Sequence, residues 1–96
     1  MNKIQKFEDI VTWQESRILV NDMYEIFNKC KDYAFRDQIQ RAVVSIMNNI
    51  AEGYERGGNR EFARFLYIAK ASCAEVRSML YIALDLEYIR PDEPMK

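Results

Sequence analysis

The sequence predicts an all-α protein, in which residues 1–96 form one antiparallel up-down helical bundle with three long helices. Apolar residues recur at steps of three and four through most of the chain, which is the period of an amphipathic helix. Only three glycines and two prolines occur, so few positions force a helix to stop. The connections between the helical segments are short, which makes consecutive helices antiparallel neighbours. No segment shows the alternating pattern of a β-strand.

The first helix is expected over residues 12–31. Thr12 and Glu15 have the spacing of a capping box, in which each side chain binds a backbone N–H at the start of the helix. The residues that recur on one face of this segment are Trp13, Ser16, Val20, Met23, Phe27 and Cys30. We expect this face to lie in the core, because a surface helix buries its apolar stripe.

The second helix is expected over residues 35–56. Its apolar face consists of Phe35, Ile39, Ala42, Val43, Ile46, Ile50 and Tyr54. Gly57 and Gly58 should end it, because glycine adopts the left-handed conformation of a helix C-terminus without strain. Gly53 lies inside the helix at a cost of ~1 kcal/mol relative to alanine. It therefore either admits a neighbouring group or marks a looser turn.

The third helix is expected over residues 59–89, with Gly58 or Asn59 as its N-cap and residues 90–96 as a tail. Pro91 should end it, because the residue before a proline avoids helical geometry. Between residues 62 and 89 the polar positions are only Arg64, Lys70, Ser72, Glu75, Arg77, Ser78, Asp85 and Glu87. A soluble helix with this composition has to be covered on more than one side.

The third helix carries a second stripe of small and aromatic residues, rotated away from its core face. Its candidate interface residues are Tyr67, Ala71, Ala74, Tyr81 and Tyr88. Tyrosines among small residues are typical of a subunit contact, where the hydroxyl reaches water or the partner. The alternative is partial burial of these tyrosines within one chain. A fourth helix or another subunit would cover the stripe.

The composition argues against several classes of function. Lys and Arg number 14 and Asp and Glu 15, so the net charge of −1 does not favour nucleic acid or membrane as a partner. Without histidine, and with two cysteines that lie apart, we predict no metal, no cofactor and no catalytic residue. Cys30 and Cys73 are expected to be small buried hydrophobes. The longest apolar run is far shorter than the ~20 residues of a membrane span, so we expect a soluble, cytoplasmic protein.

The corner between the second and third helices holds two sets of candidate residues. Arg56, Arg60 and Arg64 could form a cationic ridge that binds phosphates of nucleic acid. The alternative is that they are solvated helix ends, with their charges offset by neighbouring acids. Asn48, Asn49 and Glu52 are predicted to form a polar network between helices, with Ser72 or Arg77 as partners. Such a network fixes the register of a bundle more than it stabilises it.

Several strings occur together in the order of a known family: Trp13-Gln14, Asp37-Gln38-Ile39, Asn49-Ile50-Ala51-Glu52-Gly53, and Glu61-Phe62 followed by Phe65-Leu66. With them, residues 7–89 resemble the four-helix-bundle protein family first noticed in intervening sequences of large-subunit ribosomal RNA genes. The resemblance implies a helical bundle that assembles into a homo-oligomer, with ring-shaped pentamers in the family. More distantly, the chain is similar to accessory proteins of diversity-generating retroelements, which act with a reverse transcriptase and RNA.

The sequence departs from the family pattern at two places. Met47 stands where family members often have proline, so any kink in the second helix is expected to be weaker here. The chain stops at Lys96, whereas family members continue into a fourth helix. The resemblance therefore implies a fourth helix that is short or missing, or a fourth side that another chain fills.

Two functions remain open on the sequence. The first is a non-enzymatic, self-associating helical-bundle scaffold or adaptor. The second is a nucleic-acid-binding accessory protein, for RNA in the first instance, in which a ring-shaped oligomer presents the three corner arginines. A steep loss of affinity with salt would be typical of the second function.

Overall fold

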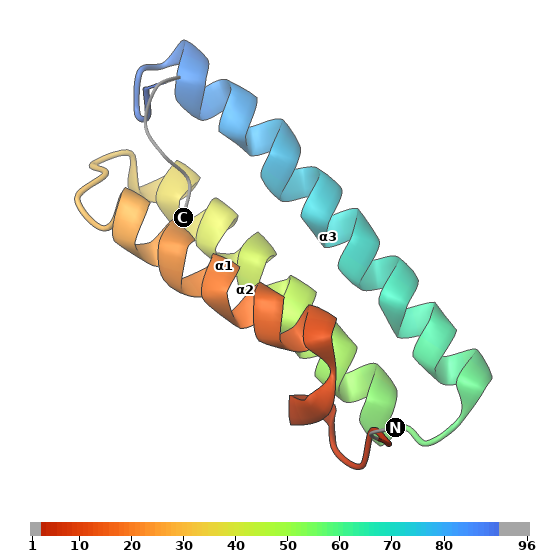
Figure 1. Ribbon diagram of the computed structural model, residues 1–96. Coiled ribbons are helices and arrows are strands. Elements are labelled where there is room, and N and C mark those ends of the chain that lie inside the picture. The colour runs from red at the N-terminus through yellow and green to blue at the C-terminus, as the bar shows by residue number, and fades with distance from the viewer. Residues whose placement is uncertain (1–2, 91–96) are drawn as a thin grey trace.

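The computed structural model describes residues 3–90 and confirms the all-α prediction over that range. A short 3-10 helix, η1 (Phe7–Asp9), precedes three long helices: α1 (Val11–Phe27), α2 (Tyr33–Glu55) and α3 (Asn59–Asp85). Consecutive long helices run in opposite directions, so the order is the up-down order that the sequence predicts (Figure 1). No strand occurs between residues 3 and 90.

The second helix lies between the other two and supplies much of the core. It packs against both α1 and α3, whereas no Cα atom of α1 lies within 8 Å of a Cα atom of α3 (Figure 1). The fully buried side chains of the core come from all three helices: Met23, Phe27, Ile39, Val43 and Ala83. One face of α3 therefore rests on α2, and its opposite face has no cover from the described part of this chain.

The first helix differs from the prediction at both ends. It begins at Val11 after Ile10, and no side chain caps its N-terminus, so the predicted capping box of Thr12 and Glu15 does not form. The physical reason is that η1 leads directly into α1, and the buried side chain of Ile10 fixes this junction. The helix ends at Phe27 rather than residue 31, because the following residues turn toward the start of α2.

The second helix begins two residues earlier than predicted. Asp32 is its N-cap, and Asp32 Oδ1 accepts a hydrogen bond from the backbone N–H of Phe35 at 3.2 Å. An aspartate in this position satisfies one of the unpaired N–H groups of the first turn. At the other end, Gly57 has a φ of +84° and donates its N–H to the carbonyl of Tyr54, so the predicted glycine termination is confirmed.

The third helix ends four residues before the predicted limit, and Pro91 lies outside the described residues. Tyr88 N–H donates to the carbonyl of Ala83 at 2.8 Å, and Glu87 N–H donates to that of Leu84 at 3.1 Å. This pair of bonds is the Schellman motif, in which the residue after the C-cap is left-handed. Glu87 takes that role with a φ of 61°, so a backbone turn at a non-glycine residue ends α3.

Gly53 allows α2 and α3 to approach each other closely near their connection. A Cβ atom added to Gly53 would lie 2.6 Å from the Cβ of Phe65 and 3.4 Å from the backbone oxygen of Phe62. Of the two explanations that the sequence offered for this glycine, the structure supports the admission of a neighbour. The helix remains regular through this position.

Candidate interaction surface

Two of the three arginines in the predicted cationic ridge are engaged within the chain. Arg56 Nη2 donates to Glu52 Oε2 at 2.9 Å, and Arg64 Nη1 donates to Glu61 Oε1 at 3.2 Å. The hydrogen bond to Glu52 raises the pKa of the Arg56 guanidinium above its usual value. Both guanidinium groups also lie over the ring of Phe65, at 5.1 and 5.6 Å from its centroid. Each arginine is thus held against a carboxylate and a buried ring.

The corner has no excess of positive charge. Arg60 is exposed in the first turn of α3, but residues 52–64 contain three acids, Glu52, Glu55 and Glu61, beside the three arginines. The structure therefore brings the predicted arginines to one corner without making a row of free cations. The contacts with Phe65 make this corner a joint between α2 and α3.

The predicted polar network between helices forms in part. Asn49 Nδ2 donates to the carbonyl and to the hydroxyl of Ser45, and the hydroxyls of Ser45 and Ser72 are 2.9 Å apart across the helix interface. Asn48 and Glu52 are exposed, so their assignment to this network is wrong. Ser45 takes their place in the network. It lies one helical turn before Asn49, and that spacing brings two side chains together on one helix face.

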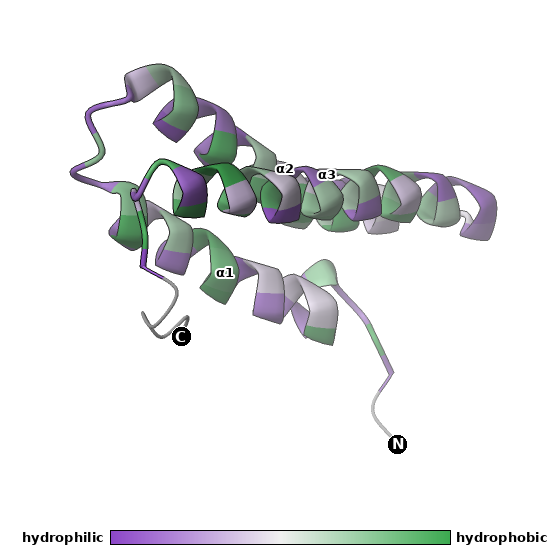
Figure 2. Cartoon of the chain, turned by 90° about the horizontal axis from the view of Figure 1, so that it is seen from above, coloured by the Kyte–Doolittle hydropathy of each residue, from purple (hydrophilic) through white to green (hydrophobic). Residues whose placement is uncertain are grey.

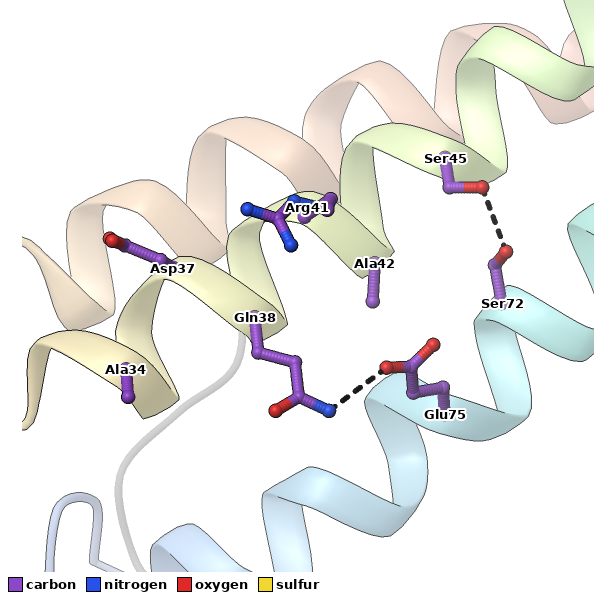
Figure 3. Close-up of a pocket in the computed structure, with 8 residues that line it drawn as sticks. All are labelled: Ala34, Asp37, Gln38, Arg41, Ala42, Ser45, Ser72 and Glu75. Carbon is purple, nitrogen blue, oxygen red and sulfur yellow. Dashed lines mark hydrogen bonds between the residues drawn. The ribbon is translucent and has the colours of Figure 1, made fainter.

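A hollow, not predictable from the sequence pattern, lies along one side of the α2–α3 interface. Figure 3 shows Gln38 donating to Glu75 at 3.3 Å across one end, with the Ser45–Ser72 pair at the other. Its volume is about 630 Å³, and its walls are Ala34, Asp37, Gln38, Arg41, Ala42, Ser45, Ser72 and Glu75. Because both signs of charge and small side chains line it, the hollow does not select an ion of one charge.

The uncovered side of α3 carries a row of exposed apolar and small side chains. We call Tyr67, Ala71, Ala74, Ser78 and Tyr81 the α3 outer face, and each of them is exposed. Tyr67 and Tyr81 are the most open, at 72% and 71% of their full surface. Hydrophobic segments recur along the helices in Figure 2, and the partly exposed Ile68 and Ile82 border the outer face. Four of the five predicted interface residues are thus together on one surface.

The fifth predicted interface residue, Tyr88, lies elsewhere. It follows the end of α3, so the helical spacing that placed it on the second stripe does not apply. Its hydroxyl donates to Asp32 Oδ2 at 2.6 Å, and its ring meets the Phe35 ring edge to face at 5.2 Å. The bond to Asp32 raises the pKa of Tyr88 to about 12, and the same bond lowers the pKa of Asp32. Tyr88 therefore joins the end of α3 to the start of α2 within one chain.

Neither cysteine is part of a disulfide, and both are half-buried. In residues 3–90, no group of three His, Cys, Asp or Glu residues has the arrangement to hold a metal ion. No described helix combines the length and the hydrophobicity that crossing a membrane requires.

Comparison with known proteins identifies the family. A family model described as 23S rRNA-intervening sequence protein matches residues 8–96. The chain belongs to this family. The same chain has no match among the curated proteins or among the solved structures.

In this intervening-sequence protein, the string at residues 49–53, which carried much of the resemblance, packs α2 against its neighbours. Asn49 joins the hydrogen bonds toward α3, Ile50 is buried in the core, and Gly53 admits Phe65. The side chain of Glu52 is exposed on the same helix and forms an ion pair with Arg56. Helix packing therefore accounts for Asn49, Ile50 and Gly53 of this string.

Proposed function

We propose that this intervening-sequence protein is a non-enzymatic scaffold or adaptor that self-associates through the α3 outer face. The observation that carries the proposal is the exposure of Tyr67 and Tyr81 along a helix whose described surroundings cover only one side. Soluble proteins rarely leave a contiguous apolar patch exposed unless it binds something. The free thiols fit a reducing compartment, so we place the protein in the cytoplasm.

The packing of the chain favours a partner over a rearrangement as the cover for the outer face. The residues that face α2 from α3, such as Phe65, Val76 and Met79, already fill the contact between the two helices. A rotation of α3 to bury Tyr67 would expose those core residues, so no rotation covers both faces. Association covers the second face while the first stays buried, and the hydrophobic effect favours that solution.

Nucleic-acid binding is the competing function, and the contacts at the corner do not favour it. Arg56 and Arg64 each pair with a carboxylate, Glu52 or Glu61, so their positive charge is offset locally. A gel-shift series on single- and double-stranded RNA at increasing salt measures this directly. Binding that falls steeply with salt, and that is lost in an Arg56→Ala/Arg60→Ala/Arg64→Ala variant, would establish the RNA function instead.

Light scattering on a sizing column, over a series of protein concentrations, tests self-association. We expect a particle larger than the 11.4 kDa chain. A Tyr67→Glu/Ala74→Glu variant should be smaller and equally helical by circular dichroism, because a buried charge without a partner opposes association.

The matched control is Tyr33→Glu/Ala34→Glu, which makes the same two changes at exposed residues of α2. This control should keep the particle size of the parent protein. A parent protein that remains a single folded chain at every concentration contradicts the proposal. Loss of association in the control as well would show that the outer face is not the contact.

A further inference from the structure

We propose that a surface of α1 in one copy of the chain packs on the α3 outer face of the next copy, with the two helices parallel. This surface, the α1 outer side, consists of Val11, Glu15, Ile18 and Asp22. Its two acids pair with Lys70 and Arg77, which border the α3 outer face. The inference rests on the proposed self-association and adds to it the second contact surface, its direction and its register.

The α1 outer side carries apolar side chains that its own chain leaves exposed. Val11 and Ile18 are exposed to 64% and 57% of their full surface. They are seven residues apart, so they lie two turns apart on one side of the helix. Glu15 and Asp22 lie beside them at the same spacing, the first exposed and the second half-buried. The α1 outer side is therefore a second apolar surface, with a negatively charged edge.

The edge of the α3 outer face repeats this pattern with the opposite charge. Lys70, Ala74, Arg77 and Tyr81 follow one another at steps of four, three and four residues, as the four members of the α1 outer side do. Both basic side chains are exposed. Within residues 3–90, neither these two bases nor the two acids of α1 form an ion pair. Each surface thus has two charges that the other can neutralise.

The position of the charges beside the apolar residues selects the parallel direction. A helix turns about 100° per residue, so Glu15 lies about 60° around α1 from Ile18. Lys70 lies about 40° around α3 from Ala74, in the opposite sense of rotation. When two parallel helices face each other, opposite senses of rotation lead to the same rim of the contact. In an antiparallel pair, the acids and the bases would lie on opposite rims.

Contacts inside one chain show which residues of α1 and α3 lie at the same level. Phe27 of α1 meets Phe35 of α2 edge to face, and the hydroxyls of Ser45 and Ser72 join α2 to α3. Because α2 is antiparallel to both neighbours, moving from Phe35 to Ser45 on α2 corresponds to moving back from Phe27 to Arg17 on α1. A residue of α1 is therefore level with the residue of α3 about 55 positions later.

The charges meet in the register that a closed ring requires. The contact joins two different surfaces, so copies associate head to tail and form a ring if the rotation between neighbours closes. Rotation about an axis parallel to the helices leaves every residue at its own level. Glu15 of one copy is then level with Lys70 of the next copy. By the same relation, Asp22 is level with Arg77.

Charge reversal tests the pairing, with sedimentation to measure association and circular dichroism to confirm folding. Lys70→Glu/Arg77→Glu and Glu15→Lys/Asp22→Lys should each raise the dissociation constant about tenfold, because like charges then face each other. The quadruple variant with both changes has opposite charges again, so its dissociation constant should return to within about threefold of the parent value. A quadruple variant that associates no better than the two double variants overturns the pairing.

Disulfide trapping tests the head-to-tail contact. The variant Ile18→Cys/Ala74→Cys is made in a Cys30→Ala/Cys73→Ala background. The new cysteines cannot join within one chain, because a disulfide needs Cα atoms closer than about 7 Å and no Cα atom of α1 lies within 8 Å of one of α3. Mild oxidation should give a ladder of covalent oligomers on a non-reducing gel, since each copy is linked to two neighbours.

Single-cysteine variants are the matched controls for this ladder. Ile18→Cys or Ala74→Cys alone should remain a monomer on the gel, and a mixture of the two should give dimers and nothing larger. A double-cysteine variant that stops at dimers or does not crosslink, or a single-cysteine variant that crosslinks alone, overturns the head-to-tail contact and leaves self-association standing. A parent protein that stays monomeric at every concentration removes both proposals.

Discussion

Replacing Gly53 with alanine tests whether α2 and α3 are held at the separation that the structure shows. In an open helix this change should stabilise the protein, because alanine exceeds glycine in helix propensity by roughly 1 kcal/mol. Here the new Cβ would lie 2.6 Å from the Cβ of Phe65 and 3.1 Å from Cδ1 of Phe62. The Cβ of Phe65 is bonded directly to the α3 backbone. The clash with it can therefore be removed only if α2 and α3 move apart.

The sign of the change in the free energy of unfolding depends on whether the steric clash outweighs the gain in helix propensity. Overpacking of a well-filled interface costs about 1–3 kcal/mol, and a contact that only a backbone shift relieves should lie at the upper end. After the gain in helix propensity is subtracted, we expect a net loss of about 1–2 kcal/mol. For a domain of this size, that loss lowers Tm by roughly 5–15 °C.

Thermal unfolding followed by circular dichroism, at one fixed protein concentration, measures the effect. Gly58→Ala is the matched control, because the added Cβ has no heavy atom within 4 Å and the φ of −119° suits any residue. Because Gly58 is the N-cap of α3, where alanine is less favourable than glycine, the control should lower the free energy of unfolding by about 0.5 kcal/mol, which is less than the loss expected for Gly53→Ala. A higher Tm for Gly53→Ala would refute the reasoning, since it would mean that the two helices separate at no cost.

Two further predictions concern the end of α3. Glu87→Gly should stabilise the protein by about 1 kcal/mol in a urea titration, because glycine adopts the left-handed φ of 61° without steric strain. An unchanged or lower midpoint would show that this turn is not strained. Tyr88→Phe should lower Tm at pH 6 by removing the bond to Asp32. The bond lowers the pKa of Asp32 below its usual value of 3.8. The bond therefore stabilises the folded protein fully above about pH 3.8, and this stabilisation is lost as the pH falls through the lowered pKa. The same bond raises the pKa of Tyr88 from 10.0 to about 12. The contribution of the Tyr88 hydroxyl to the free energy of unfolding is therefore complete below pH 10 and is lost as the pH rises through about 12. The Tm difference between the variant and the parent should therefore narrow toward both extremes of pH, and a difference that is the same at every pH would contradict this account.

The helices and the core were predictable because they depend on a periodic pattern that many residues repeat. The helical period places five apolar residues on one face of α2, and all of them are buried: Phe35, Ile39, Val43, Ile46 and Ile50. No single residue decides such a pattern. An error at one position therefore leaves the prediction intact.

The helix ends were less predictable because each depends on one local arrangement. Thr12 and Glu15 have the spacing of a capping box, but the start of α1 is set by the buried Ile10 and the preceding turn. The end of α3 depends on Glu87 in a conformation that glycine usually adopts, and the sequence has no glycine there. Neither arrangement is visible in the periodic pattern that predicts the helix itself.

The candidate site was predictable in position and less so in chemistry. Spacing alone placed four candidate interface residues on one side of α3, because helical geometry fixes which residues share a face. The corner arginines also lie where expected, but the sequence could not show that Phe65 brings Arg56 and Arg64 together over one ring. That contact joins residues of two helices and depends on the close approach that Gly53 permits.

The position of α2 between the other helices has a consequence for the order in which the molecule comes apart. Cα atoms of α1 lie within 8 Å of Cα atoms of α2 but not of α3. We therefore expect that release of α1 leaves a hairpin of α2 and α3 with its serine pair and its corner. Amide hydrogens of α1 should then exchange with solvent before those of the hairpin. The α3 outer face belongs to the part that persists, so a partner could remain bound while the first helix detaches and returns.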